Sequence, residues 1–179
     1  MPRIVLTSLL AFAAGLIGTQ VQAQAPAAPA APPSAGGTAD GMTFDIPYGT
    51  PIGLEAAQKL VAAVEAESIK HRWKMSIAVV DTHGELVAFS RMDGAQISSV
   101  GASQGKARTA ARWRRETRVF YNAIETGHGY VVTLDPTVVA APGGFLLVEG
   151  GKLIGAIGCA GGNGDQDAAA CKAGADLVK

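Results

Sequence analysis

The sequence predicts an α+β domain, in which an antiparallel sheet of about four to five strands has helices on both faces as an α/β/α sandwich. Two pairs of β-rich runs are each joined by a short link, and such links pair strands antiparallel because parallel strands need long crossovers. Segments with helical spacing precede, separate and follow the two pairs. The run from Ile77 to Val80 is apolar throughout, so we expect both faces of that strand to be covered.

A first helix is predicted from Thr50-Pro51 to about His71-Arg72. A threonine side chain can cap the free amides at a helix start, and proline suits the first turn. Apolar and small residues then recur at helical spacing, at Leu54, Ala57, Val61, Val64 and Ser68.

The first strand pair follows this helix. The runs "MSIAVVD" at residues 75–81 and "LVAFSRM" at residues 86–92 are β-rich, and the "THGE" between them is typical of a turn. Together they predict an antiparallel hairpin.

Two helices are predicted in the middle of the chain. The first runs from Ser98 or Ser99 to about Trp113 and is rich in alanine, which allows close packing against a neighbour. The second covers residues 117–124, capped by Thr117 and closed by Gly127.

A second hairpin and a last helix complete the domain. The runs "GFLLVE" and "KLIGAIGCA" flank Gly150-Gly151, a residue pair that suits a tight two-residue hairpin turn. The last helix is expected from about Asp165 or Gln166 to the end, with Asp165 as its cap.

The first 23 residues are typical of a secretory signal peptide. A basic start precedes an apolar stretch from Ile4 to about Gly18, and small residues precede a cleavage site after Ala23. The stretch is shorter than the roughly 20 residues of a membrane span. We therefore expect a periplasmic or secreted protein with no stable membrane span after cleavage, and an uncleaved anchor is the alternative.

Residues 24–41 are rich in proline and alanine and cannot bury enough surface to offset the entropy of ordering the chain. We expect a flexible tether there, followed by one folded domain at residues 42–179.

The chain has 15 lysine plus arginine residues and 15 aspartate plus glutamate residues. This balance of charge, together with export, argues against nucleic-acid binding. Cys159 and Cys171 can pair outside the cytoplasm, but free buried thiols are the expectation, since one lies in a predicted strand and the other in a helix.

The glycine-rich stretch "GAIGCAGGNGDQD" at residues 155–167 does not match a phosphate-binding loop. Gly162 and Gly164 have the first spacing of a dinucleotide fingerprint, but position 167 is aspartate, no strand follows, and no Walker lysine is present. Gly155 and Gly158 are expected instead to let another backbone or a ligand approach the strand closely.

Several dispersed blocks resemble the GlcG/HbpS-like family of heme-binding or heme-degrading domain proteins. They are "MSIAVVDTHGELVAFSRMDGA", "KARTA", "PGG" at residues 142–144 and "GAIGCAGGNGDQDAAACKAG", in the family order. The resemblance spans about residues 54–179 and implies an antiparallel sheet between helices, a homo-oligomer and, in secreted relatives, bound heme. Relatives also include glycolate-operon proteins and domains of cobalamin adenosyltransferases, so it implies fold more firmly than activity.

Thr109 is the first candidate site residue, because its "KARTA" block resembles the segment in which a threonine of secreted relatives is assigned to the heme iron. A hydrogen bond to the preceding helical turn is the alternative. The basic stretch around it offers cofactor-binding residues, since Arg108, Arg112 and Arg115 recur at roughly helical spacing and guanidinium groups bind carboxylates such as heme propionates. A solvated face balanced by Glu116 and Glu125 is the alternative.

Lys106 belongs to the same block and can bind the ligand or pair with an acidic residue such as Asp81 or Asp93. Among the histidines, His128 in "TGHGY" is the preferred second metal ligand, because it lies on a loop beside the basic helices. His71 and His83 are interpreted as surface residues. No histidine pair has the spacing of a zinc site.

Two functions follow from these residues. The first is a periplasmic or secreted heme (tetrapyrrole)-binding protein that stores, senses or buffers heme. The second is a small-molecule enzyme or accessory factor of hydroxy-acid or cofactor metabolism, which uses the same cleft. A binding protein is favoured over an enzyme, because no nucleophile motif occurs and Ala160 offers no hydroxyl before the glycine-rich turn. An oligomeric structural protein without a ligand is a third reading.

Overall fold

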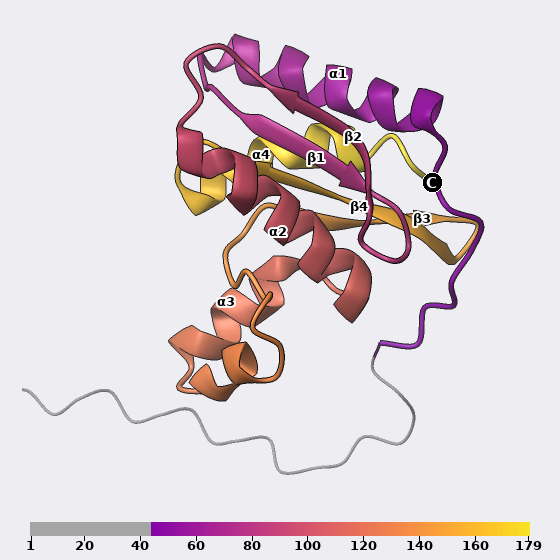
Figure 1. The fold of residues 1–179 in the computed structure, drawn as a ribbon, viewed down its shortest axis with the longest axis vertical. Helices are drawn as coiled ribbons and strands as arrows, with labels where there is room; N and C mark the ends of the chain where they lie inside the picture. The colour runs from indigo at the N-terminus through magenta and orange to yellow at the C-terminus, as the bar shows by residue number, and fades with distance from the viewer. Residues whose placement is uncertain (1–43) are drawn as a thin grey trace, which may run out of the picture. The chain divides into compact units, whose positions relative to one another are not determined.

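The computed structural model describes residues 44–179 and shows a four-stranded antiparallel sheet with helices on both faces (Figure 1). The strand order is β2-β1-β4-β3. The helices are α1 (Leu54–Lys70), α2 (Ile97–Trp113), α3 (Thr117–Glu125), the 3-10 helix η1 (Gly129–Thr133) and α4 (Gly164–Ala175). The strands are β1 (Ser76–Val80), β2 (Leu86–Arg91), β3 (Gly144–Glu149) and β4 (Lys152–Ala160). The predicted fold class is confirmed.

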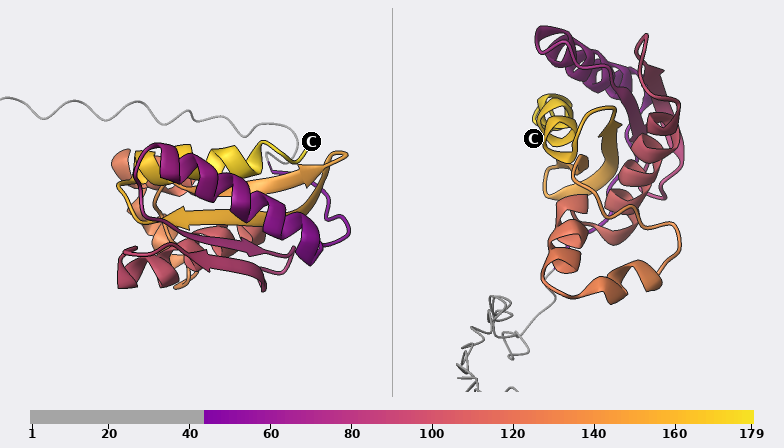
Figure 2. Two further views of the ribbon diagram at one scale, coloured as in Figure 1. Left: turned by 90° about the horizontal axis from the view of Figure 1, so that it is seen from above. Right: turned by 90° about the vertical axis from the view of Figure 1, so that its left-hand side faces the viewer.

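Two apolar clusters hold the layers together. Helices α1 and α4 cover one face of the sheet and α2 covers the other (Figure 2). The larger cluster contains branched side chains such as Leu60, Val64 and Ile157 between the sheet and α1 and α4. The smaller cluster is mostly alanine, including Ala107 of α2 and Ala156 of β4. Small side chains let α2 lie close to the sheet.

Both predicted hairpins are present. β1 pairs with β2 and β3 pairs with β4, each antiparallel, and every residue of β1 is buried. Gly150 and Gly151 both have positive φ, of 55° and 76°, which is the backbone that a tight two-residue turn requires.

The first helix begins at Leu54, so the prediction of a start at Thr50-Pro51 is wrong. The segment before it is extended and pairs with β4 instead, beyond the point where β1 ends. Gly49 N donates to Leu153 O at 2.7 Å and Ile52 N donates to Ile154 O at 2.8 Å. These sheet-like hydrogen bonds override the local helix-start signal.

Two predicted helix caps are also wrong. Thr117 does not cap α3, because it is buried and its Oγ1 accepts a hydrogen bond from Gly144 N at 2.9 Å. α4 is capped by Asn163 in a capping box with Gln166, and not by Asp165. Asp165 instead pairs with Arg118 at 2.9 Å.

Cys159 and Cys171 form a disulfide that links β4 to α4, so the expectation of free thiols is wrong. Both residues are completely buried in the cluster between the sheet and α1 and α4. The bond depends on which face of β4 is covered by α4, and that is a tertiary feature.

The predicted signal peptide and tether lie outside the described residues. Within residues 44–179 no helix is both long enough and apolar enough to cross a membrane.

Candidate functional site

The glycines of β4 allow backbone to pack directly against the strand. A Cβ on Gly158 would lie 2.2 Å from Ser103 O and 2.5 Å from Ala107 N, so α2 can cross β4 only where that side chain is missing. A Cβ on Gly155 would lie 2.3 Å from Val80 O. At both positions the close neighbour is backbone. The sequence predicted that these glycines let another backbone or a ligand approach the strand. The approach of another backbone is confirmed.

Lys106 is brought to the same place by α2, but it points inward. Its side chain is 4% exposed, and Nζ donates to Asp167 Oδ2 at 2.6 Å and to Cys159 O at 3.0 Å. The alternative of pairing with an acidic residue is confirmed, but the partner is Asp167 and not Asp81 or Asp93. The other carboxylate oxygen of Asp167 accepts from Gly162 N at 2.8 Å. This buried ion pair joins α2, β4 and α4.

A pocket of about 300 Å³ lies beside the ion pair, which we call the glycine-turn pocket. It is formed by the start of α2, the turn between β4 and α4, and the segment that precedes β3. Its lining residues are Gln96, Ser98, Ser99, Ala102, Lys106, Val139, Ala141, Ala160, Gly161, Gly162, Gly164 and Asp167.

Thr109 is buried at 3% exposure on the inward side of α2. Its Oγ1 accepts a hydrogen bond from Val139 N at 2.9 Å. The alternative prediction was a hydrogen bond from Thr109 to the preceding turn of its own helix. The observed partner, Val139, lies in the segment before β3 instead. A role of Thr109 as an iron ligand requires the segment at Val139 to move aside, and that role stays a prediction.

Arg108 and Arg112 lie together on α2 and bind the turn between β1 and β2. Arg108 Nε donates to Gly84 O at 3.3 Å and Arg112 Nε donates to His83 O at 3.2 Å. A Cβ on Gly84, whose φ is +89°, would meet both arginine side chains. The two guanidinium groups therefore have a structural role in holding this turn against α2.

Arg112 also borders a larger pocket of about 520 Å³, which we call the hairpin-turn pocket. It lies between the extended segment before α1, the β1–β2 turn and α2, and is lined by Tyr48, Gly49, Pro51, Thr82, His83 and Arg112. His83 Nδ1 lies 3.3 Å from Thr82 Oγ1 and 3.9 Å from Asp81 Oδ2. The pocket thus combines apolar surface with one imidazole and one guanidinium group.

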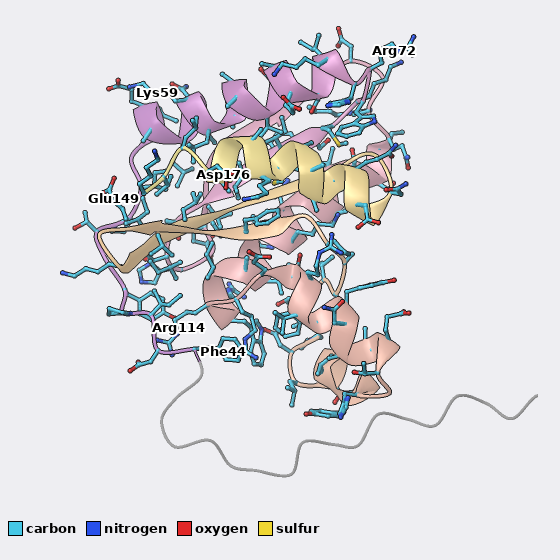
Figure 3. All side chains as sticks on the ribbon, turned by 180° about the vertical axis from the view of Figure 1, so that it is seen from behind. Phe44, Lys59, Arg72, Arg114, Glu149 and Asp176 are labelled. Atoms are coloured by element: carbon cyan, nitrogen blue, oxygen red, sulfur yellow. A yellow bond between two sulfur atoms is a disulfide. The ribbon has the colours of Figure 1, made fainter. Side chains whose placement is uncertain are left out.

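The remaining arginines of the basic stretch have other partners. Arg114 donates from Nη1 to Ile46 O at 3.0 Å, and Figure 3 shows it beside the segment that begins at Phe44. Arg115 lies 3.6 Å from the centre of the Phe44 ring. Burial, followed by the nearby charge of Arg114, lowers the pKa of the Arg115 guanidinium. These two side chains anchor the extended segment to α2.

His128 is exposed between α3 and η1. Its Nδ1 lies 3.1 Å from Thr126 Oγ1, and its ring meets the Tyr130 ring edge-on at 6.3 Å between centroids. No recorded contact joins it to Thr109, and its predicted role as a metal ligand stays a prediction.

Of the predicted site residues, Arg108 and Arg112 share one surface while Lys106 and Thr109 face inward. Sequence reasoning missed His83, which it treated as a surface residue, and Asp167, to which it gave no role in a site. Asp167 and Cys171 are four residues apart, so they share the inward face of α4, and that spacing was the available signal. No cluster of three or more metal-ligating side chains occurs in the part of the chain that the structure describes.

The described residues fold as an α/β/α sandwich domain, and the hairpin-turn and glycine-turn pockets lie on its surface. A family model described as "Haem degrading protein HbpS-like" matches residues 52–176. The chain belongs to this HbpS-like family, and the resemblance drawn from its sequence blocks is confirmed.

Individual relatives agree with this assignment. "Protein GlcG" of Escherichia coli K12 is 41% identical over 107 residues, which cover 60% of this chain and 79% of GlcG. The crystal structure of a double mutant of Streptomyces reticuli HbpS is 27% identical, has a TM-score of 0.67, and the match covers 81% of this chain and 99% of HbpS. A crystal structure named as a PduOC–heme complex is 24% identical with a TM-score of 0.67, covering 73% of this chain and 96% of that one. This last likeness shows a shared fold.

Proposed function

We propose that this protein binds heme outside the cytoplasm, in the periplasm or after secretion, and stores, senses or buffers it. Two comparisons support a heme ligand: the matching family is described by haem degradation, and a PduOC domain with the same fold is named as a heme complex. The signal-peptide pattern of residues 1–23 supports export. The disulfide between Cys159 and Cys171 is also typical of an oxidising compartment.

The observation that carries the proposal is the composition of the hairpin-turn pocket. Heme requires apolar surface for its ring, a ligand for iron, and cations for its propionates. Tyr48 and Pro51 supply apolar surface, and the pocket of about 520 Å³ falls within the range of cofactor sites. His83 is a usual type of heme ligand, and Arg112 suits a carboxylate. The residues present therefore fit a heme.

The surroundings of His83 favour one ring nitrogen as the iron ligand. Its Nδ1 lies beside Thr82 Oγ1 and the carboxylate of Asp81. In the tautomer in which Nδ1–H donates to Thr82 Oγ1, the other ring nitrogen is deprotonated and able to bind a metal. We assign Nε2 of His83 as the protein ligand of the heme iron. When heme is bound, its iron would supply redox chemistry at this site. Arg108, which holds the same turn, is a supporting residue.

Removal of the His83 imidazole tests this assignment. Hemin added to the wild-type protein should give a shifted Soret band that saturates at one equivalent. We expect His83→Ala to lower hemin affinity at least tenfold, as measured by absorbance titration. His128→Ala removes another exposed imidazole and serves as the control, with affinity expected to stay unchanged.

The outcomes separate the ligand from the site. A wild-type spectrum identical to that of free hemin would refute heme binding altogether. A loss of affinity in His128→Ala but not in His83→Ala would keep heme as the ligand and move its iron to the predicted His128 site.

A small-molecule enzyme or accessory factor of hydroxy-acid or cofactor metabolism is the second candidate function. The glycine-turn pocket favours it, since a buried lysine and carboxylate line a space separate from the hairpin-turn pocket. Lys106 belongs to this second pocket rather than to the proposed heme site. Assembly into a homo-oligomer is proposed from the family resemblance.

A further inference from the structure

We infer that a further pocket, at the C-terminal end of α1, binds a short apolar peptide with free termini, such as a dipeptide. We call it the helix-end pocket. It has a volume of about 480 Å³, and its lining residues include Glu65, Ile69, Arg72, Trp73, Lys74 and Met92. The inference goes beyond heme binding and does not depend on it, because this pocket shares no lining residue with the hairpin-turn pocket.

The turn that ends α1 places Trp73 at this pocket. Trp73 N donates to Ser68 O at 2.9 Å and Arg72 N donates to Ile69 O at 3.0 Å, which are the two hydrogen bonds of a Schellman turn. Arg72 has a φ of 58°, where such a turn usually has glycine, so this turn brings a guanidinium group to the pocket (Figure 3). The Trp73 ring stacks on the His71 ring, with 4.4 Å between centroids, which fixes its orientation.

Three apolar side chains form the middle of the pocket. Ile69 is 66% exposed, although it is a large aliphatic residue. Trp73 and Met92 are half-buried, and both pack against the apolar cluster between the sheet and α1 and α4. Covering these surfaces with apolar groups of a ligand contributes about 25 cal/mol per Å² removed from water. The ligand that fits is therefore apolar in its central part.

Glu65 lies at one end of the pocket and suits an ammonium group. Its Oε1 accepts a hydrogen bond from Ser90 Oγ, and Ser90 and Met92, two residues apart, share the face of β2 that is directed toward α1. Within residues 44–179 the half-buried Glu65 carboxylate forms no salt bridge. It can therefore accept hydrogen bonds from a cationic group of a ligand.

Lys74 lies at the other end and suits a carboxylate. A Cβ on Gly94, whose φ is 77°, would lie 2.8 Å from Lys74 Nζ and 3.0 Å from its Cδ, so the lysine side chain lies across the turn that follows β2. Arg72 and Asp93 also line the pocket, and in the described part of the chain none of these three charged groups forms a salt bridge. Two cations against one carboxylate leave this end positive.

The separation of the two ends determines the length of the ligand. Ser90, which holds Glu65, and Gly94, which Lys74 covers, are four residues apart. The extended step from Ser90 to Met92 alone accounts for about 7 Å, at roughly 3.3 Å per residue. A single α-amino acid holds its ammonium and carboxylate too close together to reach both ends. An extended dipeptide spans about 7 Å, and its two side chains can cover the apolar middle.

Calorimetry of the purified protein tests the ligand class. The probe is the apolar dipeptide leucyl-leucine, compared with its N-acetyl form, which lacks the ammonium, and with its amide, which lacks the carboxylate. We expect saturable one-to-one binding of the free dipeptide, and at least tenfold weaker binding of each blocked form and of free leucine. Absence of saturable binding, or equal affinity for the free and blocked forms, would overturn the inference.

Two substitutions assign the ends of the pocket. Glu65→Gln keeps an acceptor for Ser90, and Lys74→Met keeps an unbranched side chain over Gly94, so both variants should fold. We expect Glu65→Gln to remove the preference for the free dipeptide over its N-acetyl form only. Lys74→Met should reduce only the preference over the amide, at least fivefold.

Glu149→Gln and Lys152→Met are the matched controls, because they remove the same charges from exposed positions on either side of the β3–β4 turn. Both should retain the wild-type preferences. Equal effects of the pocket and control substitutions, or an exchange of the two expected preferences, would contradict the inference.

Discussion

Lys106 shows at the scale of single residues how a pattern in sequence can be assigned to the wrong partner. It lies in a basic stretch and in the same block as Thr109, yet its ammonium is buried against Asp167 and Cys159 O. A buried charge is tolerated only when it is paired and hydrogen-bonded. Because α2 packs with Lys106 facing inward, the ammonium requires Asp167 as its partner.

The first prediction concerns this pair. Asp167→Ala leaves the Lys106 ammonium buried without its counter-charge, and we expect the free energy of unfolding to fall by about 3–5 kcal/mol. Asp165→Ala is the control, since it removes the exposed partner of Arg118 on the same helix and should cost less than about 1 kcal/mol. Urea denaturation measures both. Equal effects of the two substitutions would contradict a structural role for the buried pair.

His83 illustrates the opposite error at this scale. Its exposed place in a hairpin turn gave no sequence signal for a site, because a turn histidine is most simply a surface residue. The hairpin-turn pocket exists because residues 48–51 lie beside the turn and α2 holds it through Arg112. Residues of three distant segments line it, and their meeting cannot be deduced from local spacing.

At the scale of elements, the crossing of α2 over β4 depends on Gly158. Ala107 and Ala110 provide small side chains on the helix, while Gly158 removes the side chain on the strand. Alanine richness in α2 correctly predicted close packing. The element that α2 contacts became clear only in the fold.

Gly158→Ala should separate α2 from β4. The new Cβ would lie within 2.5 Å of two backbone atoms, so we expect a loss of roughly 1–3 kcal/mol or more from overpacking. Gly101→Ala is the control on α2, because its added Cβ meets no atom within 4 Å beyond the backbone of its own helix, and alanine favours a helix by about 0.5–1 kcal/mol. The two substitutions should therefore change the melting temperature in opposite directions. A neutral Gly158→Ala would show that the helix can shift without cost.

Residues 44–179 form a sheet between two helical layers, and the disulfide between Cys159 and Cys171 links the sheet to one of these layers. The bond connects β4 to α4 across the apolar cluster that also contains α1. It therefore constrains the C-terminal part of the chain in the unfolded state, a means of stabilisation that is available where the protein meets an oxidising environment.

Reduction should lower the stability of the whole domain. The bond closes a loop with a sequence separation of 12 residues, for which we expect a contribution of about 2–4 kcal/mol. Dithiothreitol should shift the midpoint of urea denaturation downward in the wild type. The Cys159→Ala/Cys171→Ala variant should start at the lower midpoint and not respond to the reductant. A wild-type midpoint insensitive to reduction would contradict the predicted contribution.

The sequence by itself determined the order of the α-helices and strands, both hairpins, the fold class and the family, but not the 3-10 helix η1. These features rest on local periodicity, short links and dispersed motifs. Tertiary structure decided the start of the first helix, the Lys106–Asp167 pair, the disulfide and the pockets. The reason is that each of these features joins groups far apart along the chain, as Lys106 and Asp167 are by 61 residues. Local propensity specifies which faces are apolar, whereas packing selects which apolar faces meet.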